Sequence, residues 1–128
     1  MKKIAAVTLV LLLVAGIAYG KSYEVTRKAG DYTVDIKMDK NPPVVGPNNI
    51  EIVVKDAAGK AVTDAKVLVD YGMPAMPGHP AMGYKTDAQL KGGAYQAVLN
   101  ISMKGPWTIT VRITRAGKTA SARFTVDV

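Results

Sequence analysis

Hydrophobic and polar residues alternate with a period of two through most of the chain after Gly20. The first clear run covers residues 32–38 and reads Tyr-Thr-Val-Asp-Ile-Lys-Met. Such alternation places successive side chains on opposite faces of a strand, so it predicts half-buried strands rather than helices. Seven strands are predicted, over residues 32–38, 50–54, 65–71, 84–87, 95–101, 107–113 and 120–126. Residues 23–28 are compatible with a further edge strand, because their alternating charges would discourage edge-to-edge pairing.

Turn-forming residues separate these runs. They include Pro42-Pro43, Gly92-Gly93 and Gly105-Pro106, and proline and glycine favour turns over strand interiors. About seven short strands in roughly 100 residues are typical of an all-β fold of the immunoglobulin-like antiparallel β-sandwich type. A small β-barrel is the alternative.

The N-terminus has the pattern of a signal peptide. Lys2 and Lys3 precede an apolar run over residues 4–17, and Ala18 and Gly20 are small residues at the positions that a signal peptidase reads. We therefore expect residues 1–20 to be a signal peptide. The alternative is an uncleaved anchor, although the run is shorter than the ~20 apolar residues of a usual membrane span.

The amino-acid composition limits the number of domains and the classes of function that the protein could have. The precursor of 128 residues has 48% hydrophobic and 21% charged residues, which indicates one globular domain over residues 21–128. Either reading of the N-terminus places this domain outside the cytoplasm, in a bacterial periplasm, and loss of Lys2 and Lys3 lowers its net charge from +7 to +5.

Cys is absent and His occurs once, which excludes thiol nucleophiles, iron–sulfur clusters and Cys-type zinc sites. The basic residues are scattered, so we expect no nucleic-acid partner. No acid–base pair has a readable spacing, so we expect no enzymatic activity and no small-molecule substrate.

One segment departs from the strand pattern. Residues 73–82 read Met-Pro-Ala-Met-Pro-Gly-His-Pro-Ala-Met, with four potential soft or borderline ligands at a strict spacing of three: Met73, Met76, His79 and Met82. The three prolines favour polyproline II, which has three residues per turn and points these side chains to one face. Successive methionines would then lie ~9 Å apart, too far to share an ion. We therefore predict that the segment bends at Gly72, Gly78 and Gly83, or else that only two of these side chains bind and the other ligands come from elsewhere.

Thioether sulfur cannot be protonated near neutral pH and binds hard cations poorly. Monovalent copper and silver accept it readily and also accept a neutral imidazole. The segment therefore predicts a Cu(I) or Ag(I) site. A metal-free alternative remains open, because methionine is also a flexible gap-filler and a component of adaptable partner surfaces.

Strand parity indicates which other residues approach this segment. If consecutive strands run antiparallel, the connections after Met38, after Tyr71 and around Met103 lie at the same end of the sandwich. We therefore expect Met38 and Met103 to complete or shield the site. Trp107, at the start of the next strand, is expected to be a core residue, and a ring that lies over a bound cation is the alternative.

The chain from about Tyr32 to Ile113 resembles the YtkA-like and FixH-like families of exported β-sandwich domains. The matching features are Asn49–Lys55, Asp56–Lys60, Val62–Val67, the Met-Pro segment, Gly93-Ala-Tyr95 and Ser102-Met-Lys-Gly-Pro-Trp107. The resemblance implies an immunoglobulin-type module, often membrane-tethered or fused to metal-efflux adaptor proteins. It also implies a role in copper or heavy-metal handling and oxidase assembly, with a membrane efflux or oxidase-assembly protein as partner.

Two hypotheses follow. The first is a periplasmic protein that binds Cu(I) or Ag(I) as a chaperone, buffer or efflux accessory. The second is a metal-free module whose Met-Pro segment docks onto a membrane complex.

The signal peptide gives a direct prediction. Because cleavage is expected after Gly20, the exported protein should begin at Lys21. Mass spectrometry of the protein from the periplasmic fraction measures this. A product in the membrane fraction that retains residues 1–20 would favour the anchor instead.

Overall fold

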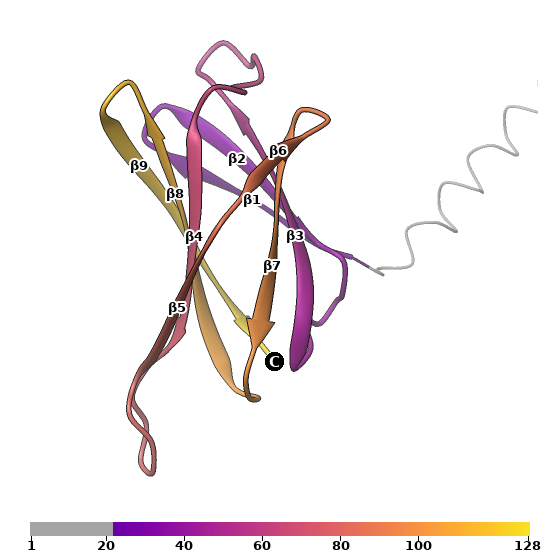
Figure 1. Cartoon of the computed structure of the whole chain (residues 1–128), viewed down its shortest axis with the longest axis vertical. Coiled ribbons are helices and arrows are strands. Elements are labelled where there is room, and N and C mark those ends of the chain that lie inside the picture. Colours follow the sequence, from indigo (N-terminus) through magenta and orange to yellow (C-terminus); the bar gives the residue numbers. More distant parts are fainter. Residues whose placement is uncertain (1–21) are drawn as a thin grey trace, which may run out of the picture.

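A computed structural model describes residues 22–128 (Figure 1). The predicted signal peptide, residues 1–20, lies outside the described residues.

The described chain forms nine strands in two antiparallel sheets. The first sheet has the order β1-β2-β3-β7-β6 and the second has the order β5-β4-β8-β9. The strands are β1 (Tyr23–Ala29), β2 (Tyr32–Met38), β3 (Gly46–Lys55), β4 (Lys66–Met73), β5 (Met82–Asp87), β6 (Gln89–Lys91), β7 (Ala94–Ile101), β8 (Pro106–Arg115) and β9 (Lys118–Asp127). The all-β sandwich is therefore confirmed and the closed barrel is wrong.

All seven predicted strands are present, and β1 is the edge strand with which residues 23–28 were compatible. Strand β6 was not predicted, because three exposed residues show no alternation. It continues the course of β5 after Ala88 but pairs with β7 of the other sheet. Because the chain passes from β5 to β6 without reversing its direction, each later connection still lies at the predicted end of the sandwich. Strand β6 also links the two sheets along one side of the sandwich.

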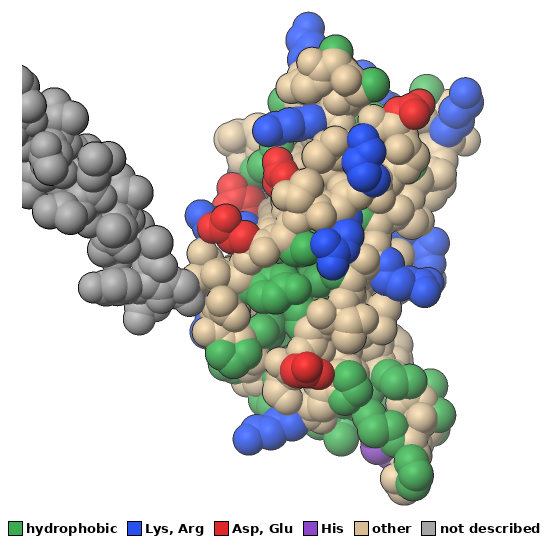
Figure 2. Space-filling model, turned by 180° about the vertical axis from the view of Figure 1, so that it is seen from behind, with side chains coloured by type: hydrophobic (Ala, Val, Ile, Leu, Met, Phe, Trp, Pro, Cys, Tyr) green, Lys and Arg blue, Asp and Glu red, His purple; other side chains and the backbone are tan. Residues whose placement is uncertain are grey.

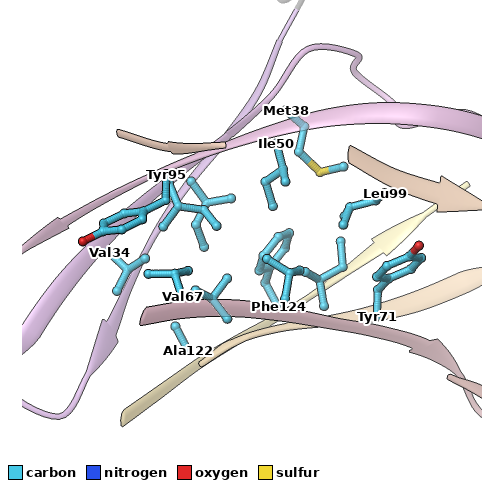
Figure 3. Packing of buried hydrophobic residues seen from close by; sticks show 14 of the residues in the cluster. Val34, Met38, Ile50, Val67, Tyr71, Tyr95, Leu99, Ala122 and Phe124 are labelled. Atoms are coloured by element: carbon cyan, nitrogen blue, oxygen red, sulfur yellow. The ribbon is translucent and has the colours of Figure 1, made fainter. Parts of the chain in front are cut away.

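The inner faces of the two sheets form one hydrophobic core. Figure 3 shows side chains from both layers meeting between the sheets, with Tyr95 and Tyr71 at opposite ends of the view. Alternation explains the composition of this core: in β4, Val67, Val69 and Tyr71 are buried and the residues between them are not. On the side opposite β6, the rings of Tyr23 and Phe124 stack 5.9 Å apart.

Trp107 is the largest fully buried side chain, with no exposed surface. Its position as a core residue is therefore confirmed. Its indole Nε1 donates a hydrogen bond of 2.9 Å to the carbonyl oxygen of Met103, so the polar edge of the ring is satisfied.

In the described part of the chain, no helix is long and apolar enough to span a membrane.

Trp107→Ala should lower the free energy of unfolding by about 3–5 kcal/mol, because it removes a large buried ring and leaves a cavity. Chemical denaturation followed by circular dichroism measures the change. A loss below about 1 kcal/mol, the usual effect of a surface substitution, would contradict full burial of this ring.

Candidate metal site

Three connections meet at one end of the sandwich, as strand parity predicts. They are residues 39–45 between β2 and β3, 74–81 between β4 and β5, and 102–105 between β7 and β8. In Figure 1 the β4–β5 connection projects well beyond this end. Figure 2 shows hydrophobic side chains covering the projection, with the histidine among them. This end therefore carries the candidate ligands of the Met-Pro segment.

The Met-Pro segment is a β-hairpin rather than a polyproline helix. Met73 lies directly opposite Met82 in the β4–β5 ladder, and Met76 forms an isolated bridge with His79. Two backbone hydrogen bonds close this bridge, from Met76 N to His79 O at 3.1 Å and from His79 N to Met76 O at 3.0 Å. The four predicted ligands thus form two cross-strand pairs.

Pro77 and Gly78 form the turn that reverses the chain. Gly78 has a φ of +99°, which side chains other than glycine disfavour, and the proline before it presets the first turn angle. The predicted bend is therefore confirmed at Gly78. It is wrong at Gly72 and Gly83, which lie in strands and pair with each other.

Cross-strand pairing brings the ligands closer than the straight polyproline helix could. Directly opposite residues in an antiparallel ladder have Cβ atoms about 4.5–5.5 Å apart, compared with ~9 Å along polyproline II. Met73 and Met76 also converge on the 102–105 connection. The terminal methyl carbons of both lie within 4 Å of the point where a Cβ on Gly105 would stand. The absence of a side chain at Gly105 therefore leaves space for these two thioethers.

The ring of His79 is oriented by its neighbour. Its Nδ1 lies 2.9 Å from the carbonyl oxygen of Pro80, and a carbonyl oxygen can only accept a hydrogen bond. A hydrogen bond here requires the proton on Nδ1, and in that tautomer Nε2 is the ring nitrogen that could bind an ion. Metal-binding histidines commonly use this arrangement, in which one ring nitrogen donates to a carbonyl and the other binds the ion.

Exposure divides the six predicted ligands into three groups. Met38 and Met73 are buried, with 0% and 2% of their surfaces exposed, whereas Met103 is 36% exposed. Met76, His79 and Met82 are half-buried. Met38 belongs to the core, where its side chain points into the layer between the sheets (Figure 3). Met38 is thus a core residue, and its expected role in completing or shielding the site stays a prediction.

The 39–45 connection is held rigidly beside this site. The amide of the fully buried Asn48 accepts from Val44 N at 2.9 Å and donates to Val44 O at 2.7 Å and Gly46 O at 3.0 Å. These bonds fix the end of the connection next to β3, where Val44 and Val45 are 39% and 47% exposed. The connection therefore presents two apolar side chains in a defined position.

A carboxylate clamps the base of the same connection. Asp39 accepts hydrogen bonds from Asn49 N at 2.9 Å and Asn49 Nδ2 at 2.8 Å, and lies 3.2 Å from Lys40 Nζ. Burial acts to raise the pKa of Asp39, but these hydrogen bonds and the lysine lower it below its ordinary value. The ionised carboxylate therefore stabilises the fold fully at pH values above the pKa that Asp39 has in the unfolded chain. This stabilisation is lost as the pH falls through the lower pKa of the folded protein.

Sequence reasoning missed a cluster of aromatic rings below the hairpin. Tyr84 stacks on Tyr71 with ring centroids 5.4 Å apart and on Trp107 at 6.2 Å. The Tyr84 hydroxyl lies 3.9 Å from Met82 Sδ. No local signal marked these tyrosines, because each reads as an ordinary strand aromatic. Their convergence depends on the pairing of β4 with both β5 and β8.

The potential soft or borderline ligands gathered at this end are thioethers and one imidazole. Within residues 22–128, no group of three or more His, Cys, Asp or Glu side chains lies close enough together to hold a metal ion. Sulfur donors of this kind suit Cu(I) and Ag(I), which accept soft ligands.

Comparison with known proteins gives one family. No curated protein and no solved structure matches the chain. Residues 26–112 match the YtkA-like family, and this range runs from β1 into β8 and includes the hairpin. Because the match covers well over half of the sequence, the chain belongs to the YtkA-like family.

Proposed function

We propose that this protein is a periplasmic binding protein for Cu(I) or Ag(I), acting in copper or heavy-metal handling as a chaperone, buffer or efflux accessory. The observation that supports this most directly is the register of the β4–β5 hairpin. It pairs Met73 with Met82 and Met76 with His79. The protein acts by holding an ion, without an enzymatic step.

The ligand chemistry supports a monovalent soft ion. The hairpin offers three neutral sulfurs and one neutral nitrogen, so an ion of single charge leaves little excess charge near the core. Met103 lies on the adjacent connection and is exposed enough to move toward an ion. Divalent zinc and magnesium favour nitrogen, thiolate or oxygen donors and would bind weakly here.

Export supports the periplasmic location. The basic start, the apolar run and the small residues before Lys21 all have the pattern of a secretory signal. An uncleaved segment would tether the same domain to the membrane surface.

A second candidate function is a metal-free module that docks onto a membrane efflux or oxidase-assembly complex. The exposure of Val44, Val45 and Met103 beside a projecting hairpin favours it, because one end then presents several apolar side chains. The FixH-like resemblance points to the same class of partner and remains a prediction. Metal binding distinguishes the two candidates.

Replacing Met73, Met76 and Met82 together with Leu should abolish tight binding of Cu(I) and Ag(I). The change removes every sulfur of the hairpin, and the loss of affinity should exceed the roughly 10–100-fold that follows loss of an outer-shell partner alone. Competition titration with a Cu(I) chelator, or calorimetry with Ag(I), measures the affinity. The unmodified protein should bind one ion and ignore Zn²⁺ and Mg²⁺.

The fold of the triple variant is the control for this experiment. Leucine keeps most of the apolar volume of methionine, so the circular dichroism spectrum of the triple variant should not change. Met38→Leu adds a matched comparison, since unchanged affinity indicates shielding and reduced affinity indicates ligation. Equal Cu(I) affinity in the triple variant and the unmodified protein would falsify the hairpin site. If the unmodified protein binds neither ion, the docking function is favoured, and the triple variant should then fail to bind the membrane complex.

The pH dependence tests His79 separately. An imidazole binds metal only without its proton, so protons compete with the ion for His79. Affinity for Ag(I) should therefore fall as the solution is acidified, and His79→Ala should bind more weakly with little pH dependence. Ag(I) titrations at a series of pH values measure both. A pH profile shared by the two proteins would exclude the imidazole as a ligand.

A further inference from the structure

The root of the hairpin has a cross-strand pair without side chains. Gly72 lies opposite Gly83, between the pair Tyr71–Tyr84 and the pair Met73–Met82. A Cβ on Gly72 would lie 2.5 Å from the carbonyl oxygen of Met82, whereas a Cβ on Gly83 would meet no atom within 4 Å. The close approach of the two backbones therefore explains why residue 72 has no side chain, but it does not explain the glycine at position 83. At this pair, no side-chain packing couples the hairpin to the sheet.

The side chain of Tyr84 spans this gap. Residues two apart in a strand share a face, and the Tyr84 hydroxyl donates to Met82 Sδ over 3.9 Å. The same hydroxyl lies 3.5 Å from Ser102 Oγ, on the connection between β7 and β8. Tyr84 therefore joins the hairpin to a second connection at the same end of the sandwich.

Aromatic neighbours hold the ring of Tyr84 in place. It stacks on Tyr71 and on the buried Trp107, and Trp107 in turn binds the carbonyl oxygen of Met103. Stacked aromatic pairs contribute beyond their buried area. The ring thus fixes the hydroxyl relative to the core, although 40% of the Tyr84 surface is exposed.

We propose that Tyr84 is a positioning residue of the metal site, a proposal that rests on the function proposed above. Its hydroxyl orients the sulfur of Met82 and holds the hairpin beside the connection that carries Met103. A thioether sulfur has two lone pairs. One accepts from Tyr84 and the other is directed to an ion. The Tyr84 hydroxyl is the donor in both contacts, and because it carries a single proton it alternates between Met82 Sδ and Ser102 Oγ.

Tyr84→Phe tests this proposal in the exported protein, because it keeps the stacked ring and removes only the hydroxyl. The affinity for Ag(I) should fall about 2- to 10-fold, the range expected for the loss of one hydrogen bond. The NMR signal of the Met82 methyl group should shift before any metal is added. Calorimetry and spectra of methyl-labelled methionine measure these effects, and the melting temperature should change little.

Tyr95→Phe is the matched control. The Tyr95 hydroxyl donates to Val62 O at 3.0 Å and accepts from Ala65 N at 3.1 Å, at the end of the core opposite Tyr71 (Figure 3). Its loss should reduce stability but leave Ag(I) affinity and the Met82 signal unchanged. Equal losses of affinity in the two variants would mean that general destabilisation is the cause.

Ser102→Ala provides a second test that does not touch the aromatic cluster. It should weaken Ag(I) binding less than Tyr84→Phe and should shift the methyl signal of Met103. If the unmodified protein binds Ag(I) and both variants match its affinity, the positioning role is wrong while the proposed function stands. If the unmodified protein binds neither Cu(I) nor Ag(I), the proposed function and this role fail together.

Discussion

The candidate site depends on the register of one antiparallel pair, β4 with β5. Because this register places Met73 opposite Met82, the turn at Pro77-Gly78 falls midway between them and pairs Met76 with His79. A shift of one residue would move each β5 side chain to the other face of its strand. Met82 and Tyr84 would then point away from Met73 and Trp107. The site is thus a property of strand pairing as much as of the ligand sequence.

The fold was predictable from the sequence because both faces of the sandwich impose a period of two. The alternation in β2, β4 and β8 survives in the structure, where most inward residues are buried and most outward residues are exposed or half-buried. The common location of the three connections was also predictable. Strand β6 was missed, yet it did not disturb that parity because it runs on from β5 without a reversal.

The conformation of the hairpin was not predicted correctly, although a signal was present. Proline followed by glycine favours a two-residue turn, and this dipeptide lies between Met76 and His79. The regular spacing of three instead favours polyproline II, because it reflects the local preference of proline and carries no information on the strand pairing on either side. Tyr84 and Gly105 carried no such signal. Their contacts join segments about 20 or more residues apart, to Trp107 and Met73 respectively, and only the assembled sheets bring these segments together.

The last described residue also contributes to this end of the molecule. Val128 pairs with Gly105 through two backbone hydrogen bonds of 2.9 Å, one from each amide to the other residue's carbonyl. This pairing extends the β8–β9 ladder by one rung and fixes the glycine against which Met73 and Met76 lie. A polyhistidine tag joined to Val128 would therefore begin beside the candidate ligands and supply additional imidazoles to any ion held there. For metal-binding measurements, an untagged protein avoids this competition.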